Sequence, residues 1–174
     1  MLLPIHLADE RPIPYATAID FCRTFTEDLH GLYLLSLLLT ADNDKAEECF
    51  VNAIGECGAG LGVFMEWASS WARRAILKHA IQLIRPVAEH PDSLPFIRPK
   101  GPASPAENKP FAAILVLGAF ERFVYVMSIL EGQSEQDCAV LLRCSRRDVV
   151  IARVLALTRL SNSDVAYAQA GEVM

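Results

Sequence analysis

Proline is concentrated in one stretch of this 174-residue sequence. Seven of its ten prolines lie in residues 86–110, which read PVAEHPDSLPFIRPKGPASPAENKP. Proline lacks a backbone N–H donor, and it disfavours a helical conformation at the residue before it. A helix therefore cannot continue through this stretch. The sequence predicts a proline-rich linker at residues 86–110, between one module at 15–85 and a second at 111–160.

Both modules are predicted to be all-α. In the first module Phe21, Phe25 and Leu29 recur at a spacing of four, which is typical of one face of a helix. The alternation of apolar and polar residues that indicates strands is not found. We expect three helices in this module, at about 16–39, 44–54 and 63–84.

Local signals suggest where two of these helices begin and end. Asp44 followed by Glu47 resembles a capping box at the start of the second helix. Four glycines at positions 55, 58, 60 and 62 predict a loop before the third helix. Trp67 and Trp71 share a face of that helix, and we expect both to pack in the core.

The second module begins with a predicted helix at about 111–131, with a possible break near Gly118. Gly132 follows this helix at the position where a left-handed residue is preferred. Two serine helix starts come next, eleven residues apart. Ser134 and Ser145 are each followed three residues later by an aspartate, the pattern of an N-cap with an acidic first turn.

Two helices that begin at Ser134 and Ser145, joined by a three-residue turn, have the spacing of a helix-turn-helix. Ala139 provides the small residue that a close crossing needs. Arg143 occupies the turn, where glycine is usual. An αα-hairpin that packs without contacting DNA is the alternative interpretation. The residues expected to lock the pair are Cys138, Leu142, Cys144 and Val149.

The second of these helices carries the candidate DNA-binding residues. Ser145, Arg146 and Arg147 open it and are placed to reach base edges or phosphates. Arg153 and Arg159 follow as candidate phosphate contacts. An apolar set, Val150, Ile151 and Val154, lies between them and is more typical of a surface that docks another helix.

The charge distribution restricts the functions that are plausible. The net charge is −5, which disfavours nonspecific coating of nucleic acid. Residues 15–90 contain ten acidic and six basic residues, whereas residues 111–160 contain five acidic and six basic ones. Any nucleic-acid face is therefore expected in the second module. Arg74 and Lys78, four residues apart in the third helix, are a weaker candidate DNA contact in the first.

The cysteine spacing and the absence of known catalytic motifs in the sequence argue against an enzyme. Five cysteines without Cys-x-x-Cys spacing predict buried free thiols, not a disulfide framework or a zinc site. No catalytic triad, nucleophilic cysteine motif or phosphate-binding glycine loop is present, so we expect no catalytic residue, cofactor or metal. The N-terminus lacks the features of a signal peptide, and no apolar run is long and uncharged enough to span a membrane. We expect a cytoplasmic protein.

Two segments of this sequence resemble the sigma-70 family of RNA polymerase sigma factors, in particular its extracytoplasmic-function type. The segment FERFVYVMSILEGQSEQDCAVLLRCSRRDVVIARVLALTRL resembles region 4, and LYLLSLLLTADNDKAEECFVNAI and EWASSWARRAILKHAI resemble region 2. The two matches occur in the family's order and flank the proline-rich linker. The residues that fit the region 4 pattern are Arg122, Val124, Glu131, Gly132, Ser134, Ala139, Leu142, Ser145 and Val149.

The resemblance implies a bacterial transcription initiation protein that binds core RNA polymerase and promoter DNA. Region 2 would dock on the polymerase, and Asp44, Glu47 and Glu48 lie in the matching helix. Region 4 would contact promoter DNA through its second helix, in which Val150 occupies a position that is usually basic. The resemblance implies no catalytic residue and no cofactor. An anti-sigma factor is a further possible partner.

The sequence departs from the family pattern at three places. Val51 and Asn52 replace a glutamine and an acid of the polymerase-docking helix, and Val150 replaces a basic residue. The loop GECGAGLGVFMEW is glycine-rich where the family has polar residues for unpaired DNA. These departures keep an alternative function open beside the sigma factor: a degenerate sigma-like module that binds a protein and has no promoter activity. A regulator that binds DNA through the second module alone is a third hypothesis.

Overall fold

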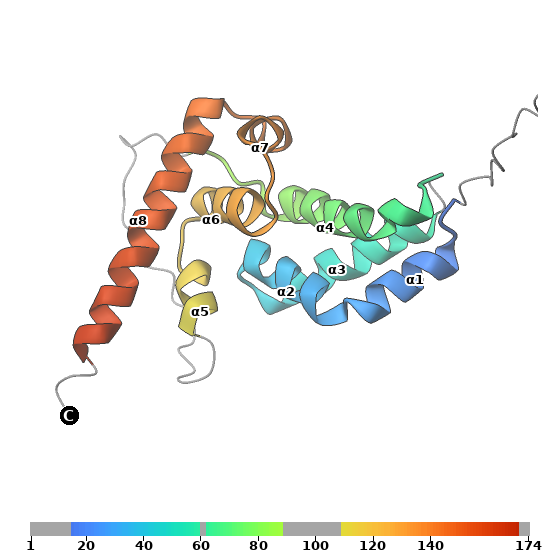
Figure 1. Cartoon of the computed structure of the whole chain (residues 1–174), viewed down its shortest axis with the longest axis horizontal. Coiled ribbons are helices and arrows are strands. Elements are labelled where there is room, and N and C mark those ends of the chain that lie inside the picture. Colours follow the sequence, from blue (N-terminus) through green and yellow to red (C-terminus); the bar gives the residue numbers. More distant parts are fainter. Residues whose placement is uncertain (1–14, 60–61, 89–108, 171–174) are drawn as a thin grey trace, which may run out of the picture.

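The computed structural model describes residues 15–59, 62–88 and 109–170 (Figure 1). Within these residues every extended regular element is a helix, which confirms the predicted all-α class. The chain-order elements are α1 (Ala18–Glu27), α2 (Leu29–Thr40), α3 (Asn43–Gly58), the 3₁₀-helix η1 (Met65–Trp67), α4 (Ala68–Ile84), α5 (Lys109–Leu115), α6 (Ala119–Tyr125), the π-helix η2 (Val126–Leu130), α7 (Glu135–Leu142) and α8 (Arg146–Ala170).

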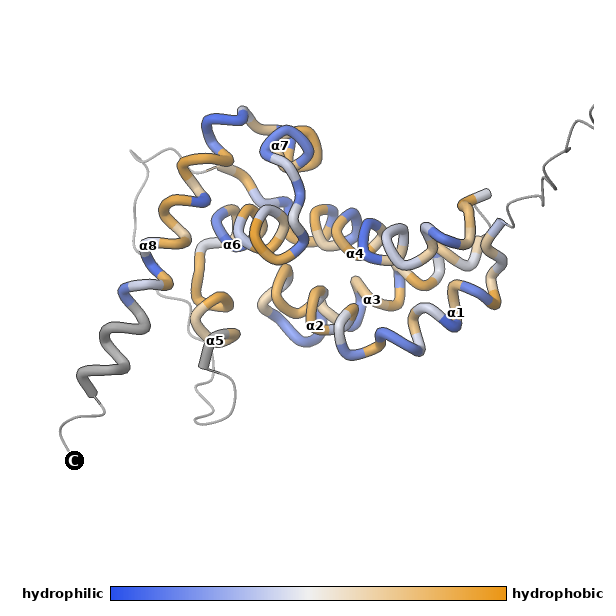
Figure 2. Tube along the Cα trace, in the orientation of Figure 1, coloured by the Kyte–Doolittle hydropathy of each residue, from blue (hydrophilic) through white to orange (hydrophobic). Residues whose placement is uncertain are grey.

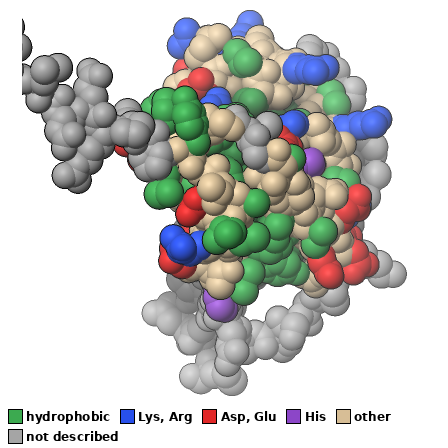
Figure 3. Space-filling model, turned by 90° about the vertical axis from the view of Figure 1, so that its right-hand side faces the viewer, with side chains coloured by type: hydrophobic (Ala, Val, Ile, Leu, Met, Phe, Trp, Pro, Cys, Tyr) green, Lys and Arg blue, Asp and Glu red, His purple; other side chains and the backbone are tan. Residues whose placement is uncertain are grey.

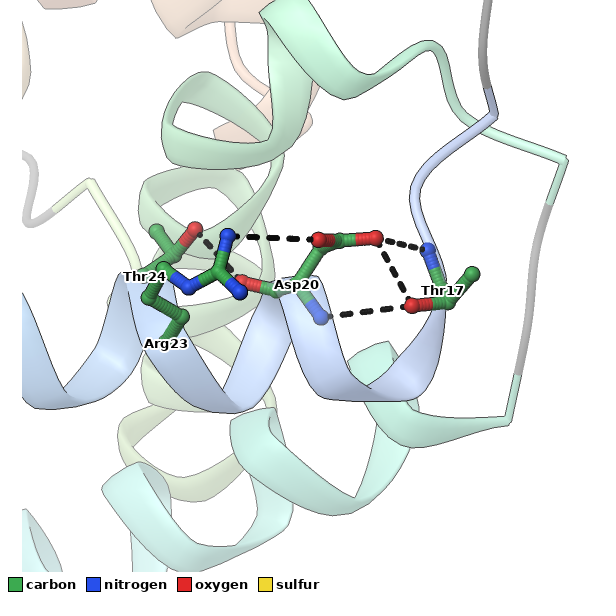
Figure 4. A network of polar contacts seen from close by, with 4 residues as sticks. All are labelled: Thr17, Asp20, Arg23 and Thr24. Carbon is green, nitrogen blue, oxygen red and sulfur yellow. Dashed lines mark hydrogen bonds and ion pairs between the residues drawn. The ribbon is translucent and has the colours of Figure 1, made fainter.

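Helix α1 begins at a reciprocal capping box that Figure 4 shows from close by. The Asp20 backbone N–H donates to Thr17 Oγ1 at 3.4 Å, and the Thr17 backbone N–H donates to the Asp20 carboxylate at 2.9 Å. The hydrogen bonds that the Thr17 backbone N–H and hydroxyl donate to the Asp20 carboxylate hold the pKa of Asp20 below its ordinary value, with a smaller contribution from Arg23. The cap satisfies donors that the first turn of a helix otherwise leaves without a partner.

The single helix predicted at 16–39 is wrong in one respect, because the chain breaks at Asp28 into α1 and α2. Asp28 has a non-helical backbone (φ −109°, ψ 31°) and ends α1. Its carboxylate accepts a hydrogen bond from Arg73 of α4 at 2.8 Å. The sequence pattern misses this break because the apolar spacing continues across it and the partner of Asp28 lies 45 residues away.

Helix α3 differs from the prediction at both ends. Its N-cap is Asp42, whose carboxylate accepts from the Lys45 backbone N–H at 3.0 Å, so Asp44 lies inside the helix. The helix also extends to Gly58, four residues beyond the expected end. The glycine loop predicted to begin at Gly55 is therefore wrong for its first half, because packing of buried Ala53 and Cys57 keeps this turn helical.

The breaks predicted in the second half of the chain are confirmed. Gly118 is the N-cap of α6 and separates it from α5. Gly132 has φ +65°, a conformation that glycine adopts without the steric cost of a Cβ. Lys109 begins α5, two residues before the predicted start. Of the predicted linker, residues 89–108 lie outside the described residues, and the division into two modules remains a prediction.

Side chains from both halves form one continuous hydrophobic core. Helices α2, α3 and α4 pack together in the first half, and α6 packs against both α2 and α8 (Figure 1). The largest fully buried side chains include Phe21 and Leu39 in the first half, and Phe123 and Met127 in the second. Packing of α6 on α2 therefore positions α7 and α8 at one end of the molecule.

Two arginines join the halves across this contact. The buried guanidinium of Arg122 in α6 donates to the backbone carbonyls of Leu39 and Thr40, at the C-terminal end of α2, at 3.3–3.5 Å. It also donates to the Leu117 carbonyl at 2.9 Å. Arg73 of α4 bonds both Asp28, at 2.8 Å, and Glu131, at 2.9 Å. Both contacts link residues that are remote in sequence.

Candidate nucleic-acid interface

Helices α7 and α8 are joined by the short turn that the sequence predicts, and both serine caps are confirmed. The Asp137 backbone N–H donates to Ser134 Oγ at 3.1 Å, and the Asp148 backbone N–H donates to Ser145 Oγ at the same distance. The Ser145 backbone N–H returns a bond to the Asp148 carboxylate at 3.0 Å. These local bonds set where α8 begins and which residues occupy its first turn.

The apolar residues predicted to lock α7 against α8 are also in place. Ala139 is 6% exposed and lies where the two helices meet. Cys138, Leu142 and Val149 are buried, and Cys144 is partly buried. Burial raises the pKa of the Cys138 thiol to about 11, so this side chain is an uncharged core residue. The close crossing leaves the first turn of α8 exposed to solvent.

Arg143 occupies the turn in the left-handed conformation, with φ +53°. The Cys144 backbone N–H donates to the Ala139 carbonyl at 3.0 Å and closes the turn. The sequence motif prefers glycine here for a physical reason: a Cβ costs about 1 kcal/mol in this conformation. Arg143 adopts this conformation despite its steric cost, and its exposed cationic side chain lies next to the first turn of α8 in the sequence.

Replacement of Arg143 by glycine is expected to raise the free energy of unfolding by about 0.5–1 kcal/mol. The gain from removing the strained Cβ exceeds the entropy that glycine adds to the unfolded chain. Chemical denaturation of the two proteins measures the difference. Arg147→Gly is the matched control: it removes another exposed arginine, from a right-handed helical position, and we expect it to destabilise the protein. If Arg143→Gly lowered the free energy of unfolding, the left-handed backbone at Arg143 would not carry the expected steric cost.

The arginines of α8 are in two different environments. Arg146 and Arg147 in the first turn are exposed. Arg146 lies 3.7 Å from Glu135, whereas Arg147 makes no ion pair with another described residue. Arg153 is held by Glu135 at 2.6 Å, and Arg159 is paired with Glu121. The first turn therefore carries the cations that are most available to an external anion.

The exposed face of α8 beyond its first turn is apolar. Val150, Ile151 and Val154 are 37%, 47% and 55% exposed and are not covered by another described part of the chain. Figure 2 shows this hydrophobic run of α8 after a hydrophilic first turn. Val150 thus lies on the outward face of the helix, in the turn that follows Arg146 and Arg147.

The candidate DNA contacts of α4, Arg74 and Lys78, are both exposed. The Lys78 ammonium lies 2.8 Å from the Glu56 carboxylate, which also contacts His79 at 2.8 Å. The hydrogen bond from Lys78 is the main reason that the pKa of Glu56 is lowered. Lys78 is therefore partly neutralised by α3, and Arg74 is the freer of the two cations.

The predicted polymerase-docking residues share one face of α3. Asp44, Glu47 and Glu48 are exposed, and together with Val51 and Asn52 they line a shallow surface depression. This face lies opposite the buried residues Ala46, Cys49 and Ala53. It is an acidic surface with an apolar residue, Val51, that is 58% exposed.

An aromatic cluster beside η1 was not predicted. Tyr15 stacks on Phe64 with ring centroids 5.0 Å apart, and Trp67 meets Phe64 edge-on at 5.2 Å. Trp67 is 56% exposed, so its predicted place in the core is wrong. Figure 3 looks onto this end of the molecule, where hydrophobic side chains reach the surface. The pairing of Tyr15 with Phe64 is non-local and has no signal in the helical periodicity.

Comparison with known proteins gives no relative for this fold or for these surfaces. No protein-family model, no curated protein and no solved structure matches the chain. Among the described residues, no group of three or more histidine, cysteine, aspartate or glutamate side chains is placed to hold a metal ion. No helix in that part of the chain combines the length and apolar character that crossing a membrane requires.

Proposed function

We propose that this protein is a sigma-factor-like transcription initiation protein that binds core RNA polymerase and promoter DNA. The observation that carries the proposal is the first turn of α8. This turn is exposed and begins at the Ser145 cap; it presents Arg147 without an ion-pair partner among the described residues, and Arg146 at 3.7 Å from Glu135. An arginine in this position can donate two hydrogen bonds to a guanine in the major groove.

Two further surfaces support the proposal. The exposed acidic face of α3, with Asp44, Glu47 and Glu48, is the proposed polymerase-docking surface. Arg74 and Lys78 on α4 provide a second, weaker cationic site for DNA. Arg153 and Arg159 are engaged by the protein's own carboxylates, so we assign them only a phosphate-attracting role. An anti-sigma factor is a further proposed partner.

The second candidate function is a sigma-like protein-interaction module without promoter activity. The observation that favours it is the apolar face of Val150, Ile151 and Val154 on the same helix that would contact DNA. An exposed apolar face of this kind is more typical of a protein interface than of a DNA interface. The test must therefore distinguish base recognition from docking of a protein.

The experiment begins with co-purification of the full chain with core RNA polymerase from its native host. Genomic duplex fragments enriched by the wild-type complex are then compared with shuffled fragments, across a salt series. We expect Arg146→Ala/Arg147→Ala to reduce the preference for enriched fragments about tenfold or more, with a modest change in salt dependence. Both arginines are expected to act mainly through base contacts.

The matched control is Arg23→Ala, which removes an exposed arginine of α1 that is paired 3.7 Å from Asp20. It should leave the preference unchanged. Failure of the wild type to co-purify with polymerase, or a preference indifferent to both arginines, would contradict promoter recognition. Either result would favour the protein-interaction module.

A further inference from the structure

Glu135, the first residue of α7, contacts two arginines of α8 with one carboxylate. One of its oxygens accepts a hydrogen bond from Arg153 at 2.6 Å, and the other lies 3.7 Å from the Arg146 guanidinium. Arg146 and Arg153 are seven residues apart, about two helical turns, so they lie on the same side of α8. Glu135 therefore spans the first two turns of the helix that carries the candidate DNA contacts.

The two contacts of Glu135 differ in strength. The side chains of Arg153 and Glu135 are only 30% and 29% exposed, so solvent screens their charges less than those of a pair on the open surface. Their contact is a charge-assisted hydrogen bond, which is stronger than one between neutral groups. The side chain of Arg146 is 65% exposed and lies farther from the carboxylate, so its attraction to Glu135 is weaker.

A DNA phosphate would compete with Glu135 for these arginines. Carboxylate and phosphate oxygens accept hydrogen bonds from a guanidinium in the same geometry. A phosphate that approaches Arg153 must therefore displace Glu135, and one that approaches Arg146 is repelled by the same carboxylate. Arg147, which has no ion-pair partner among the described residues, is not opposed in this way.

We infer that Glu135 restrains sequence-independent DNA binding by competing with DNA phosphates for Arg153 and Arg146. Glu135 is a positioning residue, because it acts on DNA binding through the two arginines. The inference rests on the proposed function in one respect: it takes α8 as the helix that approaches DNA. It adds a consequence for specificity, since a weaker attraction to phosphates leaves more of the binding to contacts with base edges.

Binding of the full chain to shuffled duplex DNA, without polymerase and across a salt series, tests the inference. Glu135→Gln removes the charge of the carboxylate and keeps the size of the side chain. We expect it to raise the affinity for shuffled duplex about five- to tenfold at low salt. The slope of log affinity against log salt concentration should steepen by about one, the effect of about one additional phosphate contact.

Glu27→Gln is the matched control. Glu27 is an exposed glutamate of α1, which lies at the opposite end of the molecule from α8 (Figure 1). Its replacement changes the net charge by the same amount, so it separates the contact of Glu135 with the arginines from the charge of the whole chain. We expect Glu27→Gln to keep the affinity for shuffled duplex within about twofold of the wild-type value, because solvent screens a distant charge.

A second measurement reports on the ion pair itself. In nuclear magnetic resonance spectra of the free protein, the guanidinium N–H protons of Arg153 should exchange with water faster in Glu135→Gln than in the wild type. Circular dichroism of each variant confirms that the helices remain folded. Unchanged exchange would show that Glu135 does not hold Arg153 in solution, and it would overturn the inference.

The binding results separate this inference from promoter recognition. If Glu135→Gln bound shuffled duplex no more tightly than Glu27→Gln, or more tightly without a steeper salt dependence, the inference would be overturned even if the wild-type complex enriched specific fragments. Tighter and more salt-dependent binding by Glu135→Gln supports the inference. It does so even if no fragment is enriched, a result that would contradict promoter recognition alone.

Discussion

Replacement of Arg122 by alanine is expected to lower the free energy of unfolding by about 3 kcal/mol. Arg122 is only 6% exposed, and its guanidinium donates to the carbonyls of Leu39, Thr40 and Leu117. Its removal leaves buried carbonyl groups without donors and opens a cavity between α6 and α2. Each effect alone costs about 1–3 kcal/mol.

The charge of Arg122 has no carboxylate partner among its described hydrogen bonds. Burial lowers its pKa to about 10, so the guanidinium remains charged near neutral pH. The partial negative charge at the C-terminal end of α2 offsets part of the cost of burying it. Arg122 thus satisfies the last carbonyls of α2 in place of a local cap, and in doing so attaches α6 to the first half of the chain.

Chemical denaturation of three variants separates these contributions. Arg122→Met keeps most of the side-chain volume but removes the donors, and we expect it to cost about 1–2 kcal/mol. Arg23→Ala removes an exposed arginine paired with Asp20, and should change stability by less than about 0.5 kcal/mol. An Arg122→Ala protein as stable as Arg23→Ala would show that the buried bonds contribute little.

Replacement of Ala139 by leucine is expected to lower the free energy of unfolding by about 2 kcal/mol. Ala139 is buried in α7, which packs against α8, and it belongs to the same core as Cys138 and Val149. Extra methylene groups at this point force the helices apart or force strained rotamers, at a cost of about 1–3 kcal/mol. The same displacement would move the first turn of α8, and therefore Arg146 and Arg147.

The adjacent residue supplies the matched control for this change. Val140 is 64% exposed, so Val140→Leu adds a methylene group on the outer side of α7. It should alter stability by less than about 0.5 kcal/mol, as surface substitutions generally do. Thermal and chemical denaturation measure both variants. Equal stability of Ala139→Leu and Val140→Leu would mean that the crossing has room for a larger residue.

The helix boundaries in the second half of this protein can be predicted from the sequence. The Ser134 and Ser145 caps, the break at Gly118 and the left-handed Gly132 each depend on residues within about four positions of one another. The short turn between α7 and α8 and the burial of Ala139 were predictable for the same reason, because a small residue and two caps at set spacings describe a local motif. Such interactions involve residues that are close together in the sequence, so a short segment is enough to predict them.

Other features depend on partners that are remote in the sequence. The break at Asp28 accompanies an ion pair with Arg73, and the exposure of Trp67 accompanies a cluster in which Tyr15 contacts Phe64. Arg73 also reaches Glu131 in the other half of the chain. Neither the break at Asp28 nor the exposure of Trp67 alters the spacing of apolar residues in the surrounding sequence. Periodicity therefore predicted one continuous helix across Asp28 and a buried Trp67.

The availability of each candidate binding residue also depends on tertiary contacts. By sequence, Arg146, Arg153 and Lys78 are all candidate DNA-contacting cations on helices. In the folded chain Glu135 holds Arg153 and Glu56 holds Lys78, while Arg146 and Arg147 stay accessible. The sequence by itself determined the all-α class and where α6, α7 and α8 begin, because these follow from interactions between near neighbours. Only the tertiary structure decided which charges are neutralised and how the two halves meet, because those outcomes require residues brought together by folding.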